Sequence, residues 1–248
     1  MMRRLSPNTK LKVKASFAFT LYILSLNIKA RFRRSQARKG FSQTGEDLLI
    51  AKFFPELDNG FYLDVGSGQP VIGSNTYFFY RQGWRGILID PIPRNVQLTR
   101  LLRSRDRVIE SLVGEIRESR NFFEFEPYEY STTVASTAEK LITSGEVNLV
   151  RILKFNTIPI SDLDLCFQPI DPCFLTVDVE GFDLQVLRSI DWDRFRPRVV
   201  CVEAWESNVS ANSKIHDLLT LNGYIEMEKT VLSKIYVFGD YVHIGSSK

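Results

Sequence analysis

The 248-residue sequence predicts an α/β protein, a doubly wound fold in which helices cover both faces of a mainly parallel sheet. Two observations support this prediction. First, 44% of the residues are hydrophobic and 25% are charged, which is typical of a globular domain. Second, short apolar runs alternate with segments whose apolar residues have helical spacing. A chain that passes repeatedly from strand to helix to strand forms right-handed crossovers, and these place the strands parallel to one another.

Five short apolar runs are the candidate strands of this sheet, and helical segments connect several of them. Ser74 can cap the start of the first helix and Gly83 can end it, because glycine readily adopts the left-handed conformation of a helix terminus. Apolar residues recur at helical spacing in 95–105 and 181–190, which predicts two more helices. The five runs are 61–65, 86–90, 107–112, 174–179 and 199–203.

Two further runs lie near the C-terminus, 224–232 and 234–242. The link between them is so short that only antiparallel pairing is open to them. The end of the chain is therefore predicted to be a β-hairpin.

The middle of the chain, about residues 115–160, lacks the alternation of strand and helix. Within it, 121–127 and 150–160 are predicted as strands, whereas the polar stretch 131–140 is predicted as a loop. We interpret this region as an insertion that forms a lid on the substrate side.

Charge divides the chain into a basic arm, residues 1–38, and a domain, residues 39–248. The first 40 residues contain eleven Lys and Arg and no acidic residue, whereas the rest of the chain carries a net charge of −8. A surface that follows nucleic-acid phosphates needs a basic face on the folded domain. The acidic domain therefore argues against nucleic acid as a partner.

The arm contains an apolar run, 15–28, that is shorter than a bilayer-spanning helix requires. No small-residue cleavage site of a secretory signal follows it. Two interpretations stay open: a helix that lies on an anionic membrane surface, or an N-terminal helix that is poorly ordered or only loosely docked. We expect a cytoplasmic protein, and under the first interpretation residues 1–38 contact the inner face of the membrane.

The stretch FYLDVGSGQP, residues 61–70, passes from an apolar run with an acid near its end into a glycine loop. In open α/β sheets, ligands bind beyond the carboxyl ends of the strands, and glycine lets the backbone approach them closely. Asp90 ends the next strand, 22 residues after Gly68, where an acid can bond the two hydroxyls of a ribose. The two features together predict a nucleoside-bearing cofactor.

The identity of this cofactor depends on the loop spacing and on Asp64. The spacing of Gly66, Gly68 and Gly73 departs from the GxGxxG pattern of dinucleotide-binding loops. A carboxylate two residues ahead of the loop would repel a pyrophosphate and attract an amino group or a sulfonium. S-adenosylmethionine carries both of these cationic groups, so the loop favours it over NAD.

Five segments together resemble the FkbM family of S-adenosylmethionine-dependent methyltransferases. They are FSQTGEDLLI at 41–50, FYLDVGSGQP at 61–70, SNTYFF at 74–79, GWRGILIDPIP at 83–93 and FLTVDVEGFDLQVL at 174–187. This resemblance implies a class I methyltransferase fold, which is Rossmann-like, with a seven-stranded sheet and an antiparallel last strand. It also implies O-methylation of a small-molecule or glycan acceptor, often at a sugar hydroxyl of a glycan, glycolipid or natural product.

The resemblance also implies a set of cofactor-binding residues. Asp64, Gly66, Ser67 and Gly68 would form the cofactor loop, Asp90 would hold the ribose, and Asn75 would line the methionine end. The segment with Gln43, Glu46 and Asp47 would lie over the cofactor, although such a cluster can equally cap a helix. Glu110 and Ser111, at the end of the third strand, lie in the region that usually holds the adenine.

Three further acids are predicted at the ends of neighbouring strands. Asp178 and Glu180 follow the fourth strand and Glu203 ends the fifth, so their carboxylates can converge on the ligand crevice. They could act as a general base for the acceptor hydroxyl. Alternatively, Asp178 and Glu180 could bind a divalent cation, or the acids could only cap the following helix.

Two other functions compete with methyl transfer. One is a noncatalytic cofactor-binding module in a membrane-associated glycan assembly complex, against which the complete set of acids argues. The other is an NAD-dependent oxidoreductase, which the glycine spacing and Asp64 disfavour.

Overall fold

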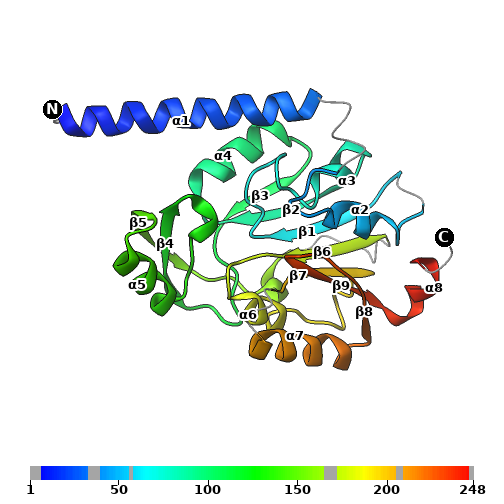
Figure 1. Ribbon diagram of the computed structural model, residues 1–248. Coiled ribbons are helices and arrows are strands. Elements are labelled where there is room, and N and C mark those ends of the chain that lie inside the picture. Colours follow the sequence, from blue (N-terminus) through cyan, green and yellow to red (C-terminus); the bar gives the residue numbers. More distant parts are fainter. Residues whose placement is uncertain (1–6, 33–39, 56–57, 165–171, 205–208, 246–248) are drawn as a thin grey trace.

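The computed structural model describes residues 7–32, 40–55, 58–164, 172–204 and 209–245, and their centre is a seven-stranded sheet (Figure 1). The strand order across the sheet is β3-β2-β1-β6-β7-β9-β8. The strands are β1 (Phe61–Val65), β2 (Arg85–Asp90), β3 (Arg107–Glu110), β6 (Cys173–Val177), β7 (Val199–Glu203), β8 (Tyr224–Lys229) and β9 (Ser233–Phe238).

Strand directions in this sheet confirm the predicted fold class. β1 pairs in parallel with both β2 and β6, β2 with β3, and β6 with β7. Only β9 runs antiparallel, to β7 on one side and to β8 on the other, so the C-terminal hairpin is also confirmed. This is the class I methyltransferase arrangement.

Several predicted strands end earlier than expected: the runs 121–127, 150–160, 224–232 and 234–242 end as strands at Glu126, Asn156, Lys229 and Phe238, and two strands of the parallel part also end early. β3 stops at Glu110 and β6 stops at Val177, each two residues before the predicted end. At both places the chain leaves the sheet to form the rim of a cavity, and Asp178 is held there by its N–H, which donates to the Val65 carbonyl at 3.0 Å. The apolar residues beyond these two strand ends line the rim of the cavity. The apolar pattern of the sequence therefore continues past the point where strand pairing stops.

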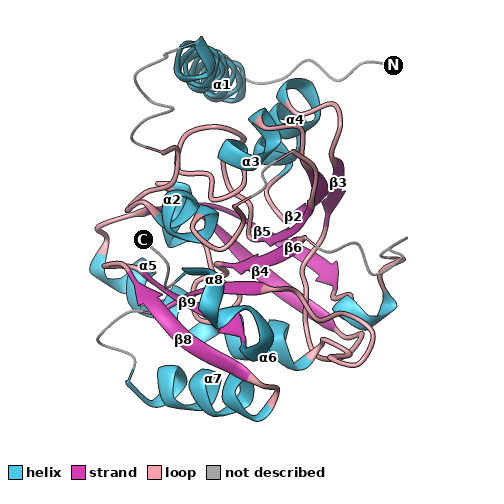
Figure 2. Cartoon of the chain, turned by 90° about the vertical axis from the view of Figure 1, so that its right-hand side faces the viewer, coloured by secondary structure: helices cyan, strands magenta, loops and turns pink. Residues whose placement is uncertain are grey.

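Helices cover both faces of the sheet, as the alternation predicts (Figure 2). Val186, Leu187, Ile215 and Leu219 pack on one face, and the other face is packed by aromatic side chains that include Phe79. The first group belongs to α6 (Asp183–Arg188) and α7 (Val209–Leu221), and the second face is covered by α2 (Glu46–Ala51), α3 (Tyr77–Arg81), α4 (Pro93–Leu102) and α8 (Val242–Gly245). Short 3-10 turns complete the chain at Tyr128–Tyr130, Ile160–Asp162 and Gly239–Tyr241.

The region 115–160 forms a small separate layer next to the main sheet. The two strands predicted here are confirmed as β4 (Ser119–Glu126) and β5 (Asn148–Asn156), and they pair antiparallel. The predicted loop 131–140 is wrong in its second half, because α5 (Ala135–Ser144) occupies it. Ala138 is fully buried there, and Gly145 ends the helix with a positive φ of 70°. The polar composition of the helix concealed its one buried side.

α1 (Pro7–Phe32) lies across the α4 side of the domain and extends beyond it (Figure 1). Its C-terminal half is packed against the domain, since Ile23 and Ala30 are buried. Within the described ranges, no helix is both long and apolar enough to cross a bilayer. Residues 1–6 and 33–38 of the arm lie outside the described residues, and the boundary between 38 and 39 stays a prediction.

Candidate active site

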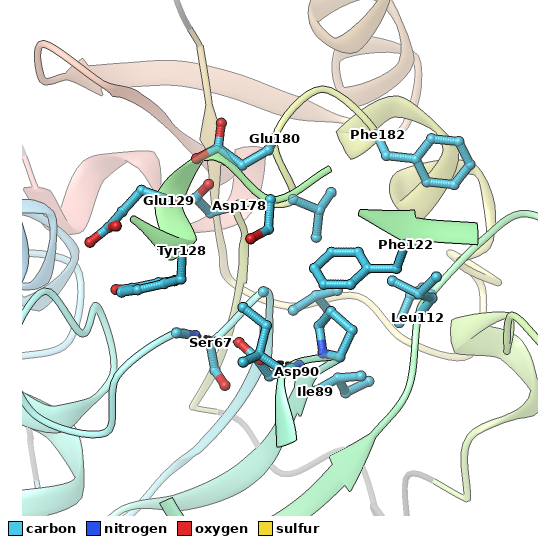
Figure 3. Close-up of a pocket in the computed structure, with 18 of the residues that line it drawn as sticks. Ser67, Ile89, Asp90, Leu112, Phe122, Tyr128, Glu129, Asp178, Glu180 and Phe182 are labelled. Atoms are coloured by element: carbon cyan, nitrogen blue, oxygen red, sulfur yellow. Dashed lines mark hydrogen bonds between the residues drawn. The ribbon is translucent and has the colours of Figure 1, made fainter. Parts of the chain in front are cut away.

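A cavity opens at the carboxyl ends of β1, β2 and β6 (Figure 3). Here the strand order reverses, with β2 on one side of β1 and β6 on the other, which is where open α/β sheets bind ligands. The space between the lining side chains, including the open mouth, is about 850 Å³. Its wall comes from the loop after β1, the ends of β2 and β3, the segment after β6, and the inserted layer.

The loop after β1 forms the floor of this cavity. Gly66 and Gly68 have φ values of 82° and 58°, which glycine adopts without strain. A Cβ atom on Gly66 would lie 1.7 Å from the Asp178 carbonyl oxygen, so no larger residue fits. Ser67 lines the cavity, and its buried Oγ has no hydrogen-bond partner among the described residues. A buried hydroxyl without a partner marks a place where a ligand can bond.

Asp90 lies beside this loop at the end of β2. Its Oδ2 accepts a hydrogen bond from the Gly68 N–H at 2.8 Å and its Oδ1 accepts one from the Ile92 N–H at 2.7 Å. Asn95 Nδ2 is a third, weaker donor, 3.4 Å from Oδ1 and 3.5 Å from Oδ2. Burial raises the pKa of Asp90 to about 7, although the hydrogen bonds from Ile92, Gly68 and Asn95 act in the opposite direction. The side chain therefore both shapes the loop and offers acceptors to a ligand.

Asp64 and Asn75 lie behind the cavity wall and are not among its lining residues. Thr76 Oγ1 donates to Asp64 Oδ2 at 2.7 Å, and Asn75 Nδ2 donates to Thr176 Oγ1 at 2.9 Å. Burial raises the pKa of Asp64 to about 6. These bonds tie the loop to β1 and β6, and the predicted contacts of both residues with the cofactor stay predictions.

In the segment around Gln43, one residue lines the cavity and two acids stabilise the fold. Gln43 lines the cavity, whereas Asp47 accepts hydrogen bonds from the Phe41 N–H at 2.6 Å and from Ser42 Oγ at 2.8 Å. Glu46 accepts from Thr230 Oγ1 at 2.7 Å. The two acids fix the turn before α2 and join it to the C-terminal hairpin. The N-cap of α2 is Gly45, which has no side-chain cap, so neither acid is an N-cap. Of the three residues only Gln43 lines the cavity, and the cofactor contact of Asp47 stays a prediction.

At the third strand the structure separates the two adenine candidates. Ser111 is buried and lines the cavity, whereas Glu110 is exposed and does not. β3 ends at Glu110, and of the two residues only Ser111, directly after this end, is placed to face the ligand.

Asp178, Glu180 and Glu203 converge as predicted. One carboxyl oxygen from each lies within 4.8 Å of the others, in a geometry that could hold a metal ion. Asp178 and Glu180 line the cavity, whereas Glu203, at the end of β7, lines an adjacent cavity together with Glu180. Figure 3 shows Asp178 and Glu180 on the side of the cavity opposite Asp90.

The pKa values of this pair are raised by their surroundings. Burial, followed by the nearby charge of Asp183, raises the pKa of Asp178 to about 7. Burial, followed by the charge of Asp178, raises the pKa of Glu180 to about 8. Glu180 also has a φ of 54°, which costs a non-glycine residue free energy, and Thr132 Oγ1 donates to its carbonyl at 3.2 Å. Strain and raised pKa values of this kind cluster at functional sites.

The inserted layer supplies cavity residues that the sequence did not indicate individually. All of these residues come from the stretch between β4 and the start of α5. The only feature of the sequence that pointed to them was the missing alternation of strand and helix in this region. Tyr128 lies over the glycine loop, with its Oη 3.4 Å from where a Cβ of Gly68 would be. The residues are Phe122, Tyr128, Glu129, Ser131 and Thr133.

Comparison with known proteins identifies the family of this chain. The Methyltransferase FkbM domain matches residues 64–226, about two thirds of the sequence. The chain belongs to the FkbM methyltransferase family. The matched range includes the glycine loop, Asp90 and all three converging acids. Among curated proteins, none matches the sequence significantly.

Solved structures similar to this FkbM methyltransferase are distant in sequence. A TehB-like SAM-dependent methyltransferase from Corynebacterium glutamicum is 13% identical, with a TM-score of 0.41 over 86% of this chain and 97% of that one. A SAM-dependent methyltransferase from Aquifex aeolicus is 13% identical, with a TM-score of 0.41 over 88% of this chain and 97% of that one. An O-methyltransferase from Bacillus cereus, in complex with SAH, is 12% identical, with a TM-score of 0.38 over 88% of this chain and 89% of that one.

S-adenosylmethionine is the cofactor of this family, and the cavity of the FkbM methyltransferase fits it. The glycines leave the backbone of the loop open, and Ser67 Oγ lacks a partner within the described part of the chain. Asp90 offers lone pairs to ribose hydroxyls, and Ser111 lies at the end of the next strand. A cationic group suits the buried carboxyl of Asp178, which lines the cavity.

Acidification is expected to stabilise the cofactor-free protein. Buried carboxyls with a raised pKa bind a proton more tightly in the folded protein than in the unfolded chain, where their pKa is about 4. Each one therefore destabilises the fold as the pH rises from about 4 through its folded pKa, which is about 6 for Asp64, about 7 for Asp90 and Asp178, and about 8 for Glu180.

Melting temperatures measured between about pH 5.5 and pH 8.5 at constant ionic strength are expected to fall with rising pH, by about 3 °C for each kcal/mol lost. The fall should be smaller in the Glu180→Gln variant. A melting temperature that rises over this range would contradict the prediction.

Proposed function

We propose that this FkbM methyltransferase transfers a methyl group to oxygen, at a hydroxyl of a carbohydrate, a glycolipid or a related small molecule. The observation that supports it is the carboxyl pair Asp178 and Glu180 on the cavity wall opposite Asp90. When bound, S-adenosylmethionine supplies an activated methyl group on a sulfonium centre. The remaining tasks, alignment of the acceptor and removal of its proton, fall to the protein.

The carboxyl pair suits the removal of a hydroxyl proton. Burial and the neighbouring acids raise the pKa of both groups, so near neutral pH the pair retains protons that free carboxyls would have lost. The pair thus supplies a carboxylate whose basicity is well above that of an ordinary carboxylate. That carboxylate accepts the proton as the acceptor oxygen forms its new bond to carbon. A divalent cation bound by the same carboxyls is the alternative means of acidifying the hydroxyl.

The charge of the cavity also favours one class of acceptor. Glu129, from the inserted layer, lines the cavity with Asp178 and Glu180, and its charge contributes to the raised pKa of Glu180. Three acids in one cavity repel phosphate and carboxylate groups. Their oxygens accept hydrogen bonds from hydroxyls. We therefore propose a neutral, polyhydroxylated acceptor.

Matched pairs of acceptors test this proposal. Full-length protein and S-adenosylmethionine are incubated with neutral glycosides and with the phosphorylated counterpart of each. Release of S-adenosylhomocysteine is followed, and the methylated atom is located by mass spectrometry and NMR. We expect methyl ethers, formed at least about tenfold faster on the neutral member of a pair. A product methylated on nitrogen or carbon would contradict O-methylation, and a preference for the phosphorylated member would contradict the charge argument.

A further inference from the structure

The C-terminal half of α1 has two different faces. Ile23, Asn27 and Ala30, spaced by four and three residues, lie on one face of the helix and are buried against the domain. Leu21, Tyr22, Ile28 and Phe32 lie on the other side and expose between 39% and 76% of their surface. Both faces are therefore largely apolar, and only one of them is covered.

Asn27 fastens the covered face to the cofactor loop. Its Oδ1 accepts hydrogen bonds from the backbone N–H groups of Val71 at 3.1 Å and Ile72 at 3.3 Å. Its Nδ2 donates to Gln69 Oε1 at 3.0 Å and to the Ile23 carbonyl at 2.9 Å. All four hydrogen-bonding positions of this fully buried amide are thus used. The helix is part of the support of the loop, and Gln69 itself lines the cavity.

The exposed face combines apolar side chains with positive charge. Lys29 and Arg31 are exposed on the same half of the helix. The first 40 residues contain eleven Lys and Arg and no acid, whereas the rest of the chain has a net charge of −8. An anionic bilayer surface attracts such a helix through its basic residues, buries its apolar ones, and repels the acidic domain behind it.

We propose that the outer face of α1 docks this enzyme on a bilayer that contains anionic lipids. The face is defined by Leu21, Tyr22, Ile28, Lys29 and Phe32. The helix lies in the plane of the interface and does not cross it, in agreement with its hydropathy. Through Asn27 the docked helix holds the cofactor loop, so the domain has a fixed orientation at the surface instead of swinging on a flexible tether.

Vesicle sedimentation of the full-length protein tests the docking. Vesicles of phosphatidylcholine alone are compared with vesicles in which about a third of the lipid is phosphatidylserine. We expect binding to the anionic vesicles, and we expect it to weaken as NaCl is raised from about 0.1 M to about 0.5 M. The double variant Leu21→Ser/Phe32→Ser should bind these vesicles at least about tenfold more weakly. Lys29→Glu/Arg31→Glu should lose the preference for anionic lipid.

The matched control is Leu221→Ser/Val231→Ser, which removes apolar residues that are 85% and 77% exposed outside α1. It should bind vesicles as the wild type does. Equal losses in the control and the α1 variant would overturn the proposal, as would equal binding to both kinds of vesicle. Self-association through the same residues, without vesicle binding, would assign the face to a second copy of the chain instead.

A separate variant tests the role of Asn27. Asn27→Leu keeps the volume of the side chain but removes its four hydrogen bonds, so the N–H groups of Val71 and Ile72 lose their acceptor. We expect it to bind S-adenosylhomocysteine several-fold more weakly while it still binds anionic vesicles. Wild-type affinity for S-adenosylhomocysteine in this variant would contradict the proposal that α1 supports the cofactor loop.

Discussion

Replacing Asp90 with alanine is expected to weaken the binding of S-adenosylhomocysteine at least about hundredfold. The carboxylate of Asp90 is placed to accept hydrogen bonds from the ribose hydroxyls, and charge-assisted bonds of this kind contribute about 1.5–3 kcal/mol each. The same carboxylate accepts the Gly68 N–H at 2.8 Å and the Ile92 N–H at 2.7 Å. Its removal therefore also loosens the glycine loop. Titration calorimetry measures the effect, with NAD as a ligand that should not bind.

Glu110 provides a matched control for this experiment. It pairs in register with Asp90 across β2 and β3, but it is exposed and does not line the cavity. Glu110→Ala should bind S-adenosylhomocysteine as tightly as the wild type, within about twofold. Asp90→Asn keeps the volume and one acceptor oxygen, so an intermediate affinity is expected. Wild-type affinity in Asp90→Ala would remove Asp90 from the cofactor site, whereas equal losses in both alanine variants would point to the sheet edge as a whole.

Replacing Glu180 with glutamine, or Asp178 with asparagine, is expected to lower kcat about 10²–10⁴-fold. The affinity for S-adenosylhomocysteine should change much less, by about threefold or less. The amides retain the size of the acids but cannot accept the proton of the acceptor hydroxyl. Burial raises the pKa of both acids, so their charged forms destabilise the folded protein. Replacing either acid with a neutral amide should therefore raise the melting temperature at about pH 8. A loss of turnover in a more stable protein cannot come from unfolding.

Glu139→Gln is the control for the carboxyl variants, since the same change is made on the exposed surface of α5. It should leave kcat, affinity and melting temperature unchanged. Retained turnover in both Glu180→Gln and Asp178→Asn would refute a base or metal role for the pair. A parallel loss of cofactor binding would assign the acids to the cofactor instead. Restored or raised turnover on addition of Mg²⁺ to the wild type, but not to the variants, would favour the metal alternative.

The central sheet and the core of the site could be predicted from local sequence pattern. Strand and helix periodicity depends on residues a few positions apart, and parallel strands bring their carboxyl ends to one edge. Asp90, the glycine loop and the converging acids all lie at such ends. The positions of these residues therefore followed once the strands were recognised.

Contacts between residues distant in sequence determine features of the site that the local sequence pattern could not predict. Glu46 and Asp47 were equally compatible with a cofactor site and with a helix cap, and the contact of Glu46 with Thr230, 184 positions away, determines its place. Asn27 contacts Val71, 44 positions away, and makes α1 a support of the cofactor loop. Neither partner is marked by spacing or composition.

The sequence by itself determined the fold class, the family and the carboxyl groups available for chemistry. Only the tertiary structure decided which of them face the cavity, which side of α1 is covered, and how the inserted layer closes over the glycine loop with Tyr128 and Glu129. The physical reason is the range of the interactions. Secondary structure and turns follow from neighbouring residues, whereas burial, raised pKa values and the last hydrogen-bond partners depend on segments that meet only when the chain is folded.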